Sequence, residues 1–379
     1  MPAIVMQCAR KAKAVAKAVA TIKTIVAATA LLTLAACSTF SPAPSAPAPA
    51  PARGAPIDET PVVTAKMIAA QEALGQMVTL QDRLYRVAAP LLINNADLCR
   101  TQARNLLGFT AKNKYSYPGE FVDAAQAVLG YGDRLQVSGV LAGSGAARAG
   151  LRRGDTLLAL EGKNLPVGQN AETLAAAMFG PLVGSHATLN LTVWRGGANQ
   201  VLNIPVTRAC AFKVDLGNAD NINSYADGQR VLITRGMINF AQSDEAIAFV
   251  LAKDIAHNVL GHAGTLRSTA TIGGIIDNLV AVRPDLSMLI GSAGVKPVPQ
   301  ELDAAADRLA LYLLARANYN VEHAHAFWQR LATQYPATVL NGYNATHPAI
   351  AYRLAAIDRT VVDIKARQAA NKPLVPQLP

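Results

Sequence analysis

Apolar and polar residues recur with different periods along the chain and divide it into two folded regions. Within residues 64–130, the apolar positions of 64–98 recur three and four apart, which predicts a helical N-terminal region. Residues 131–208 instead hold short apolar runs separated by glycine-bearing turns, a pattern typical of a β-rich domain. From 211 to 361 the pattern is mainly helical after one strand, Arg230–Thr234. We therefore predict an α+β fold, in which a β-rich domain precedes a mainly α-helical domain with a small sheet.

The first 36 residues have the features of a secretion signal. Basic residues end at position 23, and the apolar run that follows is too short to favour a permanent membrane span. The run ends in LAAC at 34–37, which resembles the cleavage site of a bacterial lipoprotein, where the cysteine is acylated. An ordinary secretion signal with an incidental cysteine is the alternative. We expect a lipid on Cys37 and a place in the cell envelope, at the outer membrane facing the periplasm, because Ser38 gives no inner-membrane retention signal.

Composition outside the signal indicates a tether, a tail and no nucleic-acid partner. Residues 37–63 are rich in Pro, Ala and Ser up to position 56, which is typical of an extended linker. Residues 362–379 are predicted to be a C-terminal tail. The formal net charge of +10 becomes +5 without the five basic residues of the signal. No dense stripe of Lys and Arg remains, so we do not expect nucleic acid as a partner.

Two of the four cysteines remain for the folded part of the chain. Cys8 lies in the signal and Cys37 would carry the lipid, which leaves Cys99 and Cys210. In an oxidising compartment these two can form a disulfide, and two buried free thiols are the alternative. Because they flank the β-rich region, we favour the disulfide. On the chain-entropy model it would add about 4–5 kcal/mol to the free energy of unfolding.

The β-rich region carries a distinctive series of small residues after a short strand at 136–141. The series comprises Gly143-Ser144, Ala146-Ala147, Ala149-Gly150-Leu151 and Gly154-Asp155. It resembles the PDZ domains that are attached to envelope proteases. The resemblance implies a groove that adds a peptide, often a C-terminus, as an extra strand, bordered here by Gly139, Val140 and Leu141. A small domain that binds nothing is the alternative.

The segment FVLAKDIAHNVLGHAG at 249–264 resembles a zinc-peptidase helix in which a residue has changed. Its apolar residues recur four apart, as in a buried helix. In the H-E-x-x-H motif, two histidines four apart bind the metal and the glutamate is the general base. Here Lys253, Asp254 and His257 occupy those positions, so only the second histidine is present.

Further segments resemble the CAAX prenyl protease and HtpX family of zinc metalloendopeptidases, in the family's order. They are the turn and strand region from Asn223 through Gly228 to Gly236, the helix from Gln300, and Thr346-His347-Pro348. The resemblance extends over residues 211–361. It implies a zinc cofactor, cleavage of envelope proteins, and an edge strand at Asn223, Gly228 and Gly236 that pairs with extended polypeptide substrate.

The resemblance also assigns the residues of the site. Lys253, His257 and Asp303 stand at the ligand positions, Asp254 stands at the general-base position, and Asp307 and His347 stand at supporting positions. Where the family has glutamates, Asp254 and Asp303 are one methylene shorter, and a protonated Lys253 has no lone pair for a metal. We therefore expect zinc binding to be impaired or lost, and a protein that binds polypeptides without cutting them.

The substitutions lead to a specific hypothesis for the former metal site. Lys253 and His257 share one helix face and Asp303 should face them, so Lys253 is predicted to donate to Asp303 in place of a metal. Two rival interpretations stay open. One is an active peptidase whose metal is held by His257, Asp303 and a further donor, with His347 as the reserve candidate. The other is a structural lipoprotein that uses neither groove.

Overall fold

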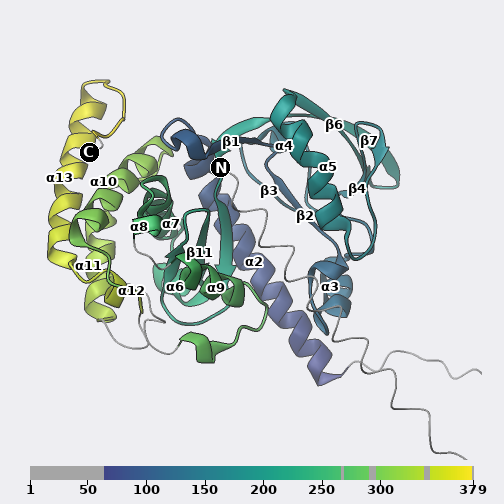
Figure 1. Ribbon diagram of the computed structural model, residues 1–379, viewed down its shortest axis with the longest axis horizontal. Coiled ribbons are helices and arrows are strands. Elements are labelled where there is room, and N and C mark those ends of the chain that lie inside the picture. The colour runs from purple at the N-terminus through teal and green to yellow at the C-terminus, as the bar shows by residue number, and fades with distance from the viewer. Residues whose placement is uncertain (1–63, 266–268, 290–295, 337–341, 378–379) are drawn as a thin grey trace, which may run out of the picture. The chain divides into compact units, whose positions relative to one another are not determined.

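The computed structural model describes residues 64–377 apart from 266–268, 290–295 and 337–341 (Figure 1). The predicted signal, the lipidation site at Cys37 and the tether lie outside the described residues. Helices and strands are mixed along the described chain, which confirms the α+β class. No helix among the described residues combines the length and the hydrophobicity that a membrane crossing requires.

A long first helix and the helices of the second half of the chain form the helical domain. Helix α2, Ala65–Ile93, begins after Thr64, whose hydroxyl accepts a hydrogen bond from the Met67 amide. The later helices are α6 Arg235–Ala241, α7 Asp244–Val259, α8 His262–Thr265, α9 Thr269–Leu279, η3 Leu286–Leu289, α10 Gln300–Arg316, α11 Ala324–Gln334, α12 Gly342–Thr346 and α13 Ile350–Ala369. Helices α7 and α10 pack together in the largest hydrophobic core, and α13 lies beside α10 (Figure 1).

The segment predicted as a tail from residue 362 is in part helix. Helix α13 continues to Ala369, and Ile364 is fully buried in the core. Neither Gly nor Pro occurs between residue 362 and Pro373, so nothing in the sequence ends the helix earlier. The chain that follows is also held, because Arg316 donates to the Leu374 carbonyl.

The helical domain contains a three-stranded sheet in the order β10-β11-β9. Its strands are β9 Lys213–Gly217, β10 Ser224–Ala226 and β11 Arg230–Thr234. Strand β11 pairs antiparallel with β10 and parallel with β9, so it is the central strand and β10 is an edge. The prediction that this region supplies an edge is therefore wrong for β11 and for Gly236, which lies in α6. The continuous apolar run Val231–Ile233, buried on both faces, explains the central position.

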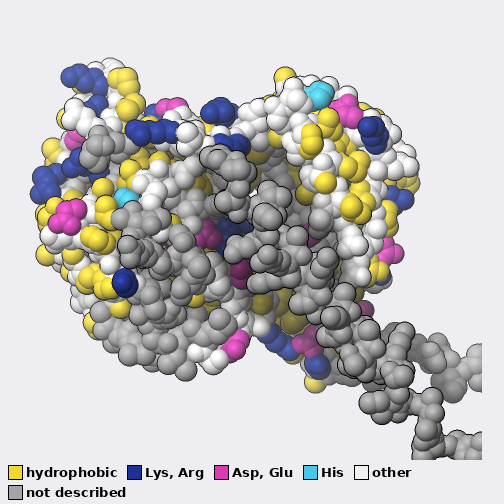
Figure 2. Space-filling model, in the orientation of Figure 1, with side chains coloured by type: hydrophobic (Ala, Val, Ile, Leu, Met, Phe, Trp, Pro, Cys, Tyr) yellow, Lys and Arg dark blue, Asp and Glu magenta, His cyan; other side chains and the backbone are white. Residues whose placement is uncertain are grey.

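The β-rich domain is one six-stranded sheet with two helices, in the order β2-β3-β4-β6-β7 and with β5 paired to β4. Its elements are β2 Phe109–Lys112, β3 Gln136–Val140, α4 Gly145–Arg148, β4 Thr156–Leu160, β5 Lys163–Asn164, α5 Ala171–Ser185, β6 Thr188–Arg195 and β7 Ala198–Pro205. It has a hydrophobic core of its own, to which Leu189, Leu191 and Val193 of β6 contribute alternate residues. In Figure 2, hydrophobic side chains gather on the surface around α5, where Leu174 is exposed.

Two strands precede the predicted start of this domain and change its edge. Strand β2 lies within the region 64–130 that we expected to be helical, as do β1 Ala103–Leu106, η1 Arg100–Gln102, η2 Lys114–Ser116 and α3 Phe121–Leu129. Because β2 pairs antiparallel with β3, β3 is an interior strand. The assignment of Gly139, Val140 and Leu141 to a groove edge is therefore wrong, and the open edge belongs to β2. Phe-Thr-Ala-Lys alternates apolar and polar residues, but four residues are the shortest run in which alternation indicates a strand, so the signal is weak.

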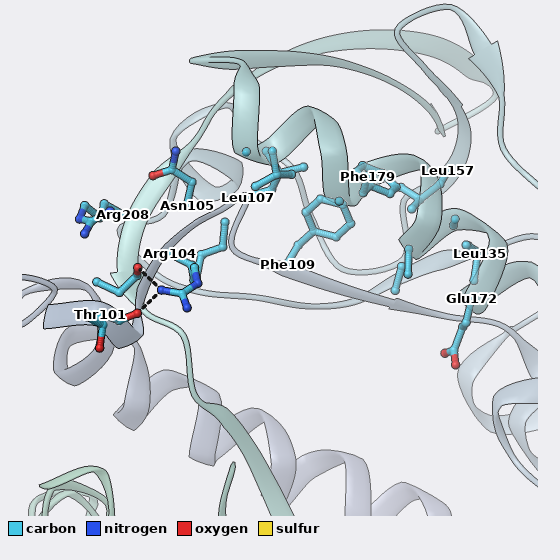
Figure 3. Close-up of a pocket in the computed structure, with 18 of the residues that line it drawn as sticks. Thr101, Arg104, Asn105, Leu107, Phe109, Leu135, Leu157, Glu172, Phe179 and Arg208 are labelled. Atoms are coloured by element: carbon cyan, nitrogen blue, oxygen red, sulfur yellow. Dashed lines mark hydrogen bonds between the residues drawn. The ribbon is translucent and has the colours of Figure 1, made fainter. Parts of the chain in front are cut away.

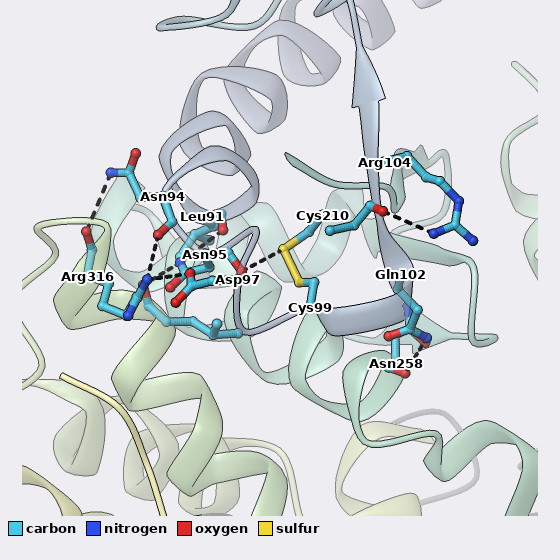
Figure 4. Close-up of a disulfide and its surroundings, with 12 residues drawn as sticks. Leu91, Asn94, Asn95, Asp97, Cys99, Gln102, Arg104, Cys210, Asn258 and Arg316 are labelled. Atoms are coloured by element: carbon cyan, nitrogen blue, oxygen red, sulfur yellow. Dashed lines mark hydrogen bonds and ion pairs between the residues drawn. A yellow bond between two sulfur atoms is a disulfide. The ribbon is translucent and has the colours of Figure 1, made fainter. Parts of the chain in front are cut away.

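The two domains are joined by a two-stranded ribbon and a disulfide. Strand β1 leads into the β-rich domain and pairs antiparallel with β8, Thr207–Cys210, which leads out of it. Cys99 and Cys210 are disulfide-bonded at the end of this ribbon, with Cα atoms 5.5 Å apart (Figure 4). Gln102 in the same segment donates to the Asn258 carbonyl near the end of α7. Both ends of the β-rich domain are thus fixed to the core of the helical domain.

Candidate metallopeptidase-type site

Helices α7 and α10 bring the predicted site residues together. Helix α7 starts after Ser243, whose hydroxyl accepts from the Ala246 amide, and its residues from 246 to 258 are all buried. A helix buried on every face has to place its polar residues against partners. Lys253 and His257 therefore point at α10, where Asp303 is completely buried.

Lys253 occupies the centre of a buried ion-pair network, and the predicted pairing with Asp303 is present. Its ammonium lies 2.6 Å from Asp303 Oδ1 and 3.4 Å from Asp307 Oδ1. Arg353 of α13 holds Asp307 with two hydrogen bonds, of 2.7 Å and 3.0 Å. The Lys253 side chain is only 1% exposed, and it lies over the Trp328 ring at 5.4 Å. The lysine is therefore part of the packed interior and does not point into solvent.

Two histidines lie against the Asp303 carboxylate, and a third lies beside one of them. His347 Nδ1 lies 2.8 Å from Asp303 Oδ1, and His257 Nε2 lies 3.4 Å from that oxygen. Together with Asp303, these two could hold a metal ion, since their ligand atoms lie within 4.8 Å of one another. His262 does not approach Asp303 in this way and instead meets His257, with their Nδ1 atoms 2.9 Å apart. The sequence indicated His347 as a reserve donor, but it gave no sign of the contact between His257 and His262.

Burial sets the protonation states of the site. Desolvation lowers the pKa of His347 and of His262 to about 4 and also lowers the pKa of His257, so these rings are neutral at pH 7. Desolvation alone would raise the pKa of Asp303, but His347, Lys253 and Arg353 hold it well below its usual range. Asp303 is therefore an anion beside neutral imidazoles. Burial and Arg353 lower the pKa of Lys253, while Asp303 and Asp307 favour its charged form.

The general-base position is buried as well. Asp254 is 3% exposed, and one of its carboxylate oxygens has no hydrogen-bond partner among the described residues. Desolvation raises the pKa of Asp254 to about 7, although the Ser224 hydroxyl and Lys253 oppose the rise. The adjoining cavity, lined by Asp254, His257 and His347, measures about 50 Å³. Since roughly 10–15 Å³ of such space is enough for one water molecule, this cavity can hold a few waters but not a polypeptide segment.

These residues do not fit a zinc ion in the arrangement that they adopt. The oxygen that His257 and His347 would share with a metal, Asp303 Oδ1, is already bound by the Lys253 ammonium. Lys253 and Arg353 carry two positive charges, which Asp303 and Asp307 balance. A divalent cation would add two uncompensated charges to a buried site, and such burial is very costly.

The strand and turn expected to bind substrate lie beside this cavity. Asn223, Ser224 and Ala226 line it, and β10 is the sheet edge nearest to α7. Gly228 forms the turn between β10 and β11 with φ of +96°, a conformation that favours glycine. Its amide donates to Asn258 Oδ1, and Asn258 also donates to the Arg230 carbonyl. The turn is thereby fixed to the end of α7.

A larger groove lies in the β-rich domain, between β2 and α5 (Figure 3). We call this cavity, of about 950 Å³, the β2–α5 groove. Its apolar wall includes Phe109 of β2 and Phe179 of α5, whose ring centroids are 5.9 Å apart. Arg104 and Arg208 lie toward one end and Glu172 toward the other (Figure 3). The sequence predicted a groove bordered by Gly139, Val140 and Leu141, whereas this cavity is bordered by β2.

The arrangement of these residues is of the metallopeptidase type, and comparison with known proteins shows which family this part of the chain is similar to. Residues 197–361 match peptidase family M48, a family of zinc-dependent metallopeptidases. This part of the chain is therefore similar to the M48 peptidase domain, in line with the resemblance to zinc metalloendopeptidases.

Among curated proteins, this chain is similar to metalloendopeptidase OMA1 of mitochondria. It is 26% identical to the human protein over 173 residues, which cover 40% of this chain and 33% of that protein. It is 25% identical to the Bos taurus protein over 195 residues, or 45% of this chain and 36% of that protein. The Schizosaccharomyces pombe protein is 22% identical over 147 residues, or 37% of this chain and 44% of that protein. The chain thus spans less than half the length of these relatives.

Proposed function

We propose that this protein binds polypeptides in the bacterial cell envelope and that its M48-family domain does not cut them. The observation that carries the proposal is the ion pair between Lys253 and Asp303, which are 2.6 Å apart at two of the family's ligand positions. An ammonium that fills the place of the metal cannot polarise a peptide carbonyl or activate a water molecule as a metal does.

The state of Asp254 supports the loss of hydrolysis. A general base has to reach a water molecule that attacks the substrate. Asp254 is buried beside a cavity of about 50 Å³, which leaves no space for a substrate next to such a water molecule. Its side chain is also one methylene shorter than the glutamate of the motif, so it reaches less far toward the site.

The β2–α5 groove supports capture of a polypeptide end. Strand β2 pairs only with β3 among the described strands, so its other edge is open to a further strand. Arg100 and Arg208 line the groove, and neither has a carboxylate partner within 4 Å among the described residues. Charge complementarity therefore favours a free C-terminal carboxylate at this end, as in PDZ domains. The domain is proposed to be PDZ-like on this basis.

The location is proposed from the sequence alone. The lipoprotein-type motif at Cys37 and the Pro/Ala-rich tether would hold the folded chain near a membrane surface on the periplasmic side. A buried disulfide between Cys99 and Cys210 suits an oxidising compartment.

The proposal is tested with the full chain in detergent, an unfolded fluorescent casein and a chelator. We expect the casein to bind, to remain uncut after long incubation, and to bind equally well with or without chelator. Cleavage that stops on chelation would overturn the proposal in favour of an active peptidase with an atypical metal site. Absence of both binding and cleavage would favour a structural lipoprotein.

A further inference from the structure

The open edge of β2 adjoins two cavities on opposite faces of the sheet. One is the β2–α5 groove. The other, of about 580 Å³, lies between β2 and helix α2, and we call it the α2 cleft. Ala111 and Glu172 line both cavities, so the two meet at this edge. Thr110 and Lys112 line only the α2 cleft, whereas Phe109 lines only the groove.

Side chains alternate along a strand, so each residue of an added strand would point into one cavity or the other. Residues directly opposite one another in a sheet have side chains on the same face, whether the strands run parallel or antiparallel. A residue bound opposite Phe109 therefore points toward α5. A residue bound opposite Lys112 points into the α2 cleft. These two β2 residues are three apart. The captured segment would therefore place one side chain in each cavity, at positions three residues apart.

The charged residues of the α2 cleft are paired, with two exceptions. Arg153 pairs with Asp82, Lys213 Nζ lies 3.0 Å from Asp215, and Asp277 lies 2.6 Å from Arg230, which is outside the lining. Glu172 accepts a hydrogen bond of 2.7 Å from the Ser116 hydroxyl and has no basic partner within 4 Å among the described residues.

Lys112 is the second exception. Among the described residues, its ammonium has no carboxylate within 4 Å and no hydrogen bond. It lies over the Tyr117 ring, 4.9 Å from the ring centroid. Desolvation lowers the pKa of Lys112, with Glu172 and Asp215 opposing the shift from a distance and Lys213 adding to it. A partly buried cation without an anionic partner is stabilised by a ligand that supplies one.

We propose that Lys112 selects an acidic side chain in the captured segment, three residues from an apolar side chain that lies opposite Phe109. The inference rests on the proposed function, because it assumes that β2 captures an extended polypeptide. It makes the cleft between the two domains part of the recognition surface. A captured polypeptide would then contact residues of the helical domain as well as of the β-rich domain.

The test uses fluorescent octapeptides with a C-terminal Val, an Ala/Ser background and a single Glu or Gln placed at each position in turn. For the wild-type full chain, we expect one position at which Glu binds about tenfold more tightly than Gln, as a charge-assisted hydrogen bond supplies. Lys112→Met should abolish this ratio, and Lys112→Arg should restore most of it. Lys213→Met is the matched control, since Lys213 lines the same cleft but is paired with Asp215.

The outcomes separate this inference from the proposed function. Peptide binding by wild type with equal affinity for Glu and Gln at every position would overturn the inference alone. So would an unchanged Glu preference in Lys112→Met, once thermal unfolding shows that the variant is folded. No binding by any peptide to any variant would overturn the proposed capture at β2 and the inference with it.

Discussion

The charged side chains of the M48-type site are paired with one another, whereas the arginines of the β2–α5 groove have no charged partner among the described residues. Around Lys253, two cations and two carboxylates neutralise one another in a buried network, and the adjoining cavity measures about 50 Å³. The groove measures about 950 Å³ and is lined by Arg100 and Arg208, which have no carboxylate partner among the described residues. On our proposal, the groove, with its unpaired charges and open space, binds the polypeptide, and the Lys253 network has a structural role.

The largest expected effect tests whether the Lys253 site is structural. Lys253→Met removes the cation and leaves Asp303 and Asp307 buried with Arg353 as their one remaining cation, which should lower the free energy of unfolding by about 3–5 kcal/mol. Urea denaturation of the full chain measures it. The control is Lys213→Met, whose ammonium also pairs with an aspartate but is 62% exposed, and which should cost no more than about 1 kcal/mol. Equal effects of the two variants would contradict a structural role for the site.

The disulfide should have the next largest effect, on the junction between the two regions. Replacing Cys99 and Cys210 by Ser releases the ends of the β-rich domain and should lower the free energy of unfolding by about 2–4 kcal/mol. A strong reductant should bring the wild type down to the stability of the double variant and should leave the variant unchanged. If reduction has no effect on wild-type unfolding, the bridge does not hold the domains as described.

The free energy of unfolding should depend on pH through the buried carboxyl group of Asp254. Because the pKa of Asp254 is raised to about 7 in the folded chain, the folded state keeps a proton that the unfolded state loses near pH 4. Stability should therefore fall as pH rises from about 4 to about 7, by at most about 1.4 kcal/mol per pH unit, and this contribution should change little above pH 7. Asp254→Asn should remove that slope, so its advantage over wild type should grow across the window. Parallel stability curves for the two proteins would show that Asp254 is not desolvated.

The smallest expected effect concerns the basic end of the groove. Arg208→Ala should weaken binding of a peptide with a free C-terminus by a few fold, since an exposed charge pair contributes about 0.2–1 kcal/mol. A C-terminally amidated peptide should bind more weakly to wild type and should not be affected further by the substitution. Fluorescence anisotropy at low and high salt measures both. An equal loss for the free and the amidated peptide would mean that Arg208 does not recognise the carboxylate.

The sequence predicted the buried helix better than the sheet edges. Spacing within one helix fixes which residues share a face, and this placed Lys253 and His257 together on α7. The family resemblance placed Asp303 opposite them. Strand β2 carries only a weak signal, since the alternation of Phe-Thr-Ala-Lys extends over just four residues. Its pairing with β3 joins segments far apart in the chain. The central position of β11 likewise depends on β9, which pairs with it across an intervening turn and strand.

The contact between His257 and His262 shows a second limit of sequence reasoning. The two residues are five apart, and on a continuous helix they would point in different directions. Helix α7 ends at Val259, and Gly261, with φ of +70°, turns the chain so that His262 comes back toward His257. The break at Gly261 is what makes the contact possible.

The most direct test of the central claim is the zinc content of the full chain, purified without chelator, beside the variant Lys253→His/Asp254→Glu/Asp303→Glu. We predict no bound zinc in the wild type and stoichiometric zinc in the triple variant, because the substitutions remove the ammonium and restore the donors of the motif. Stoichiometric zinc in the wild type would contradict the account, since it would show that a metal displaces Lys253 from Asp303.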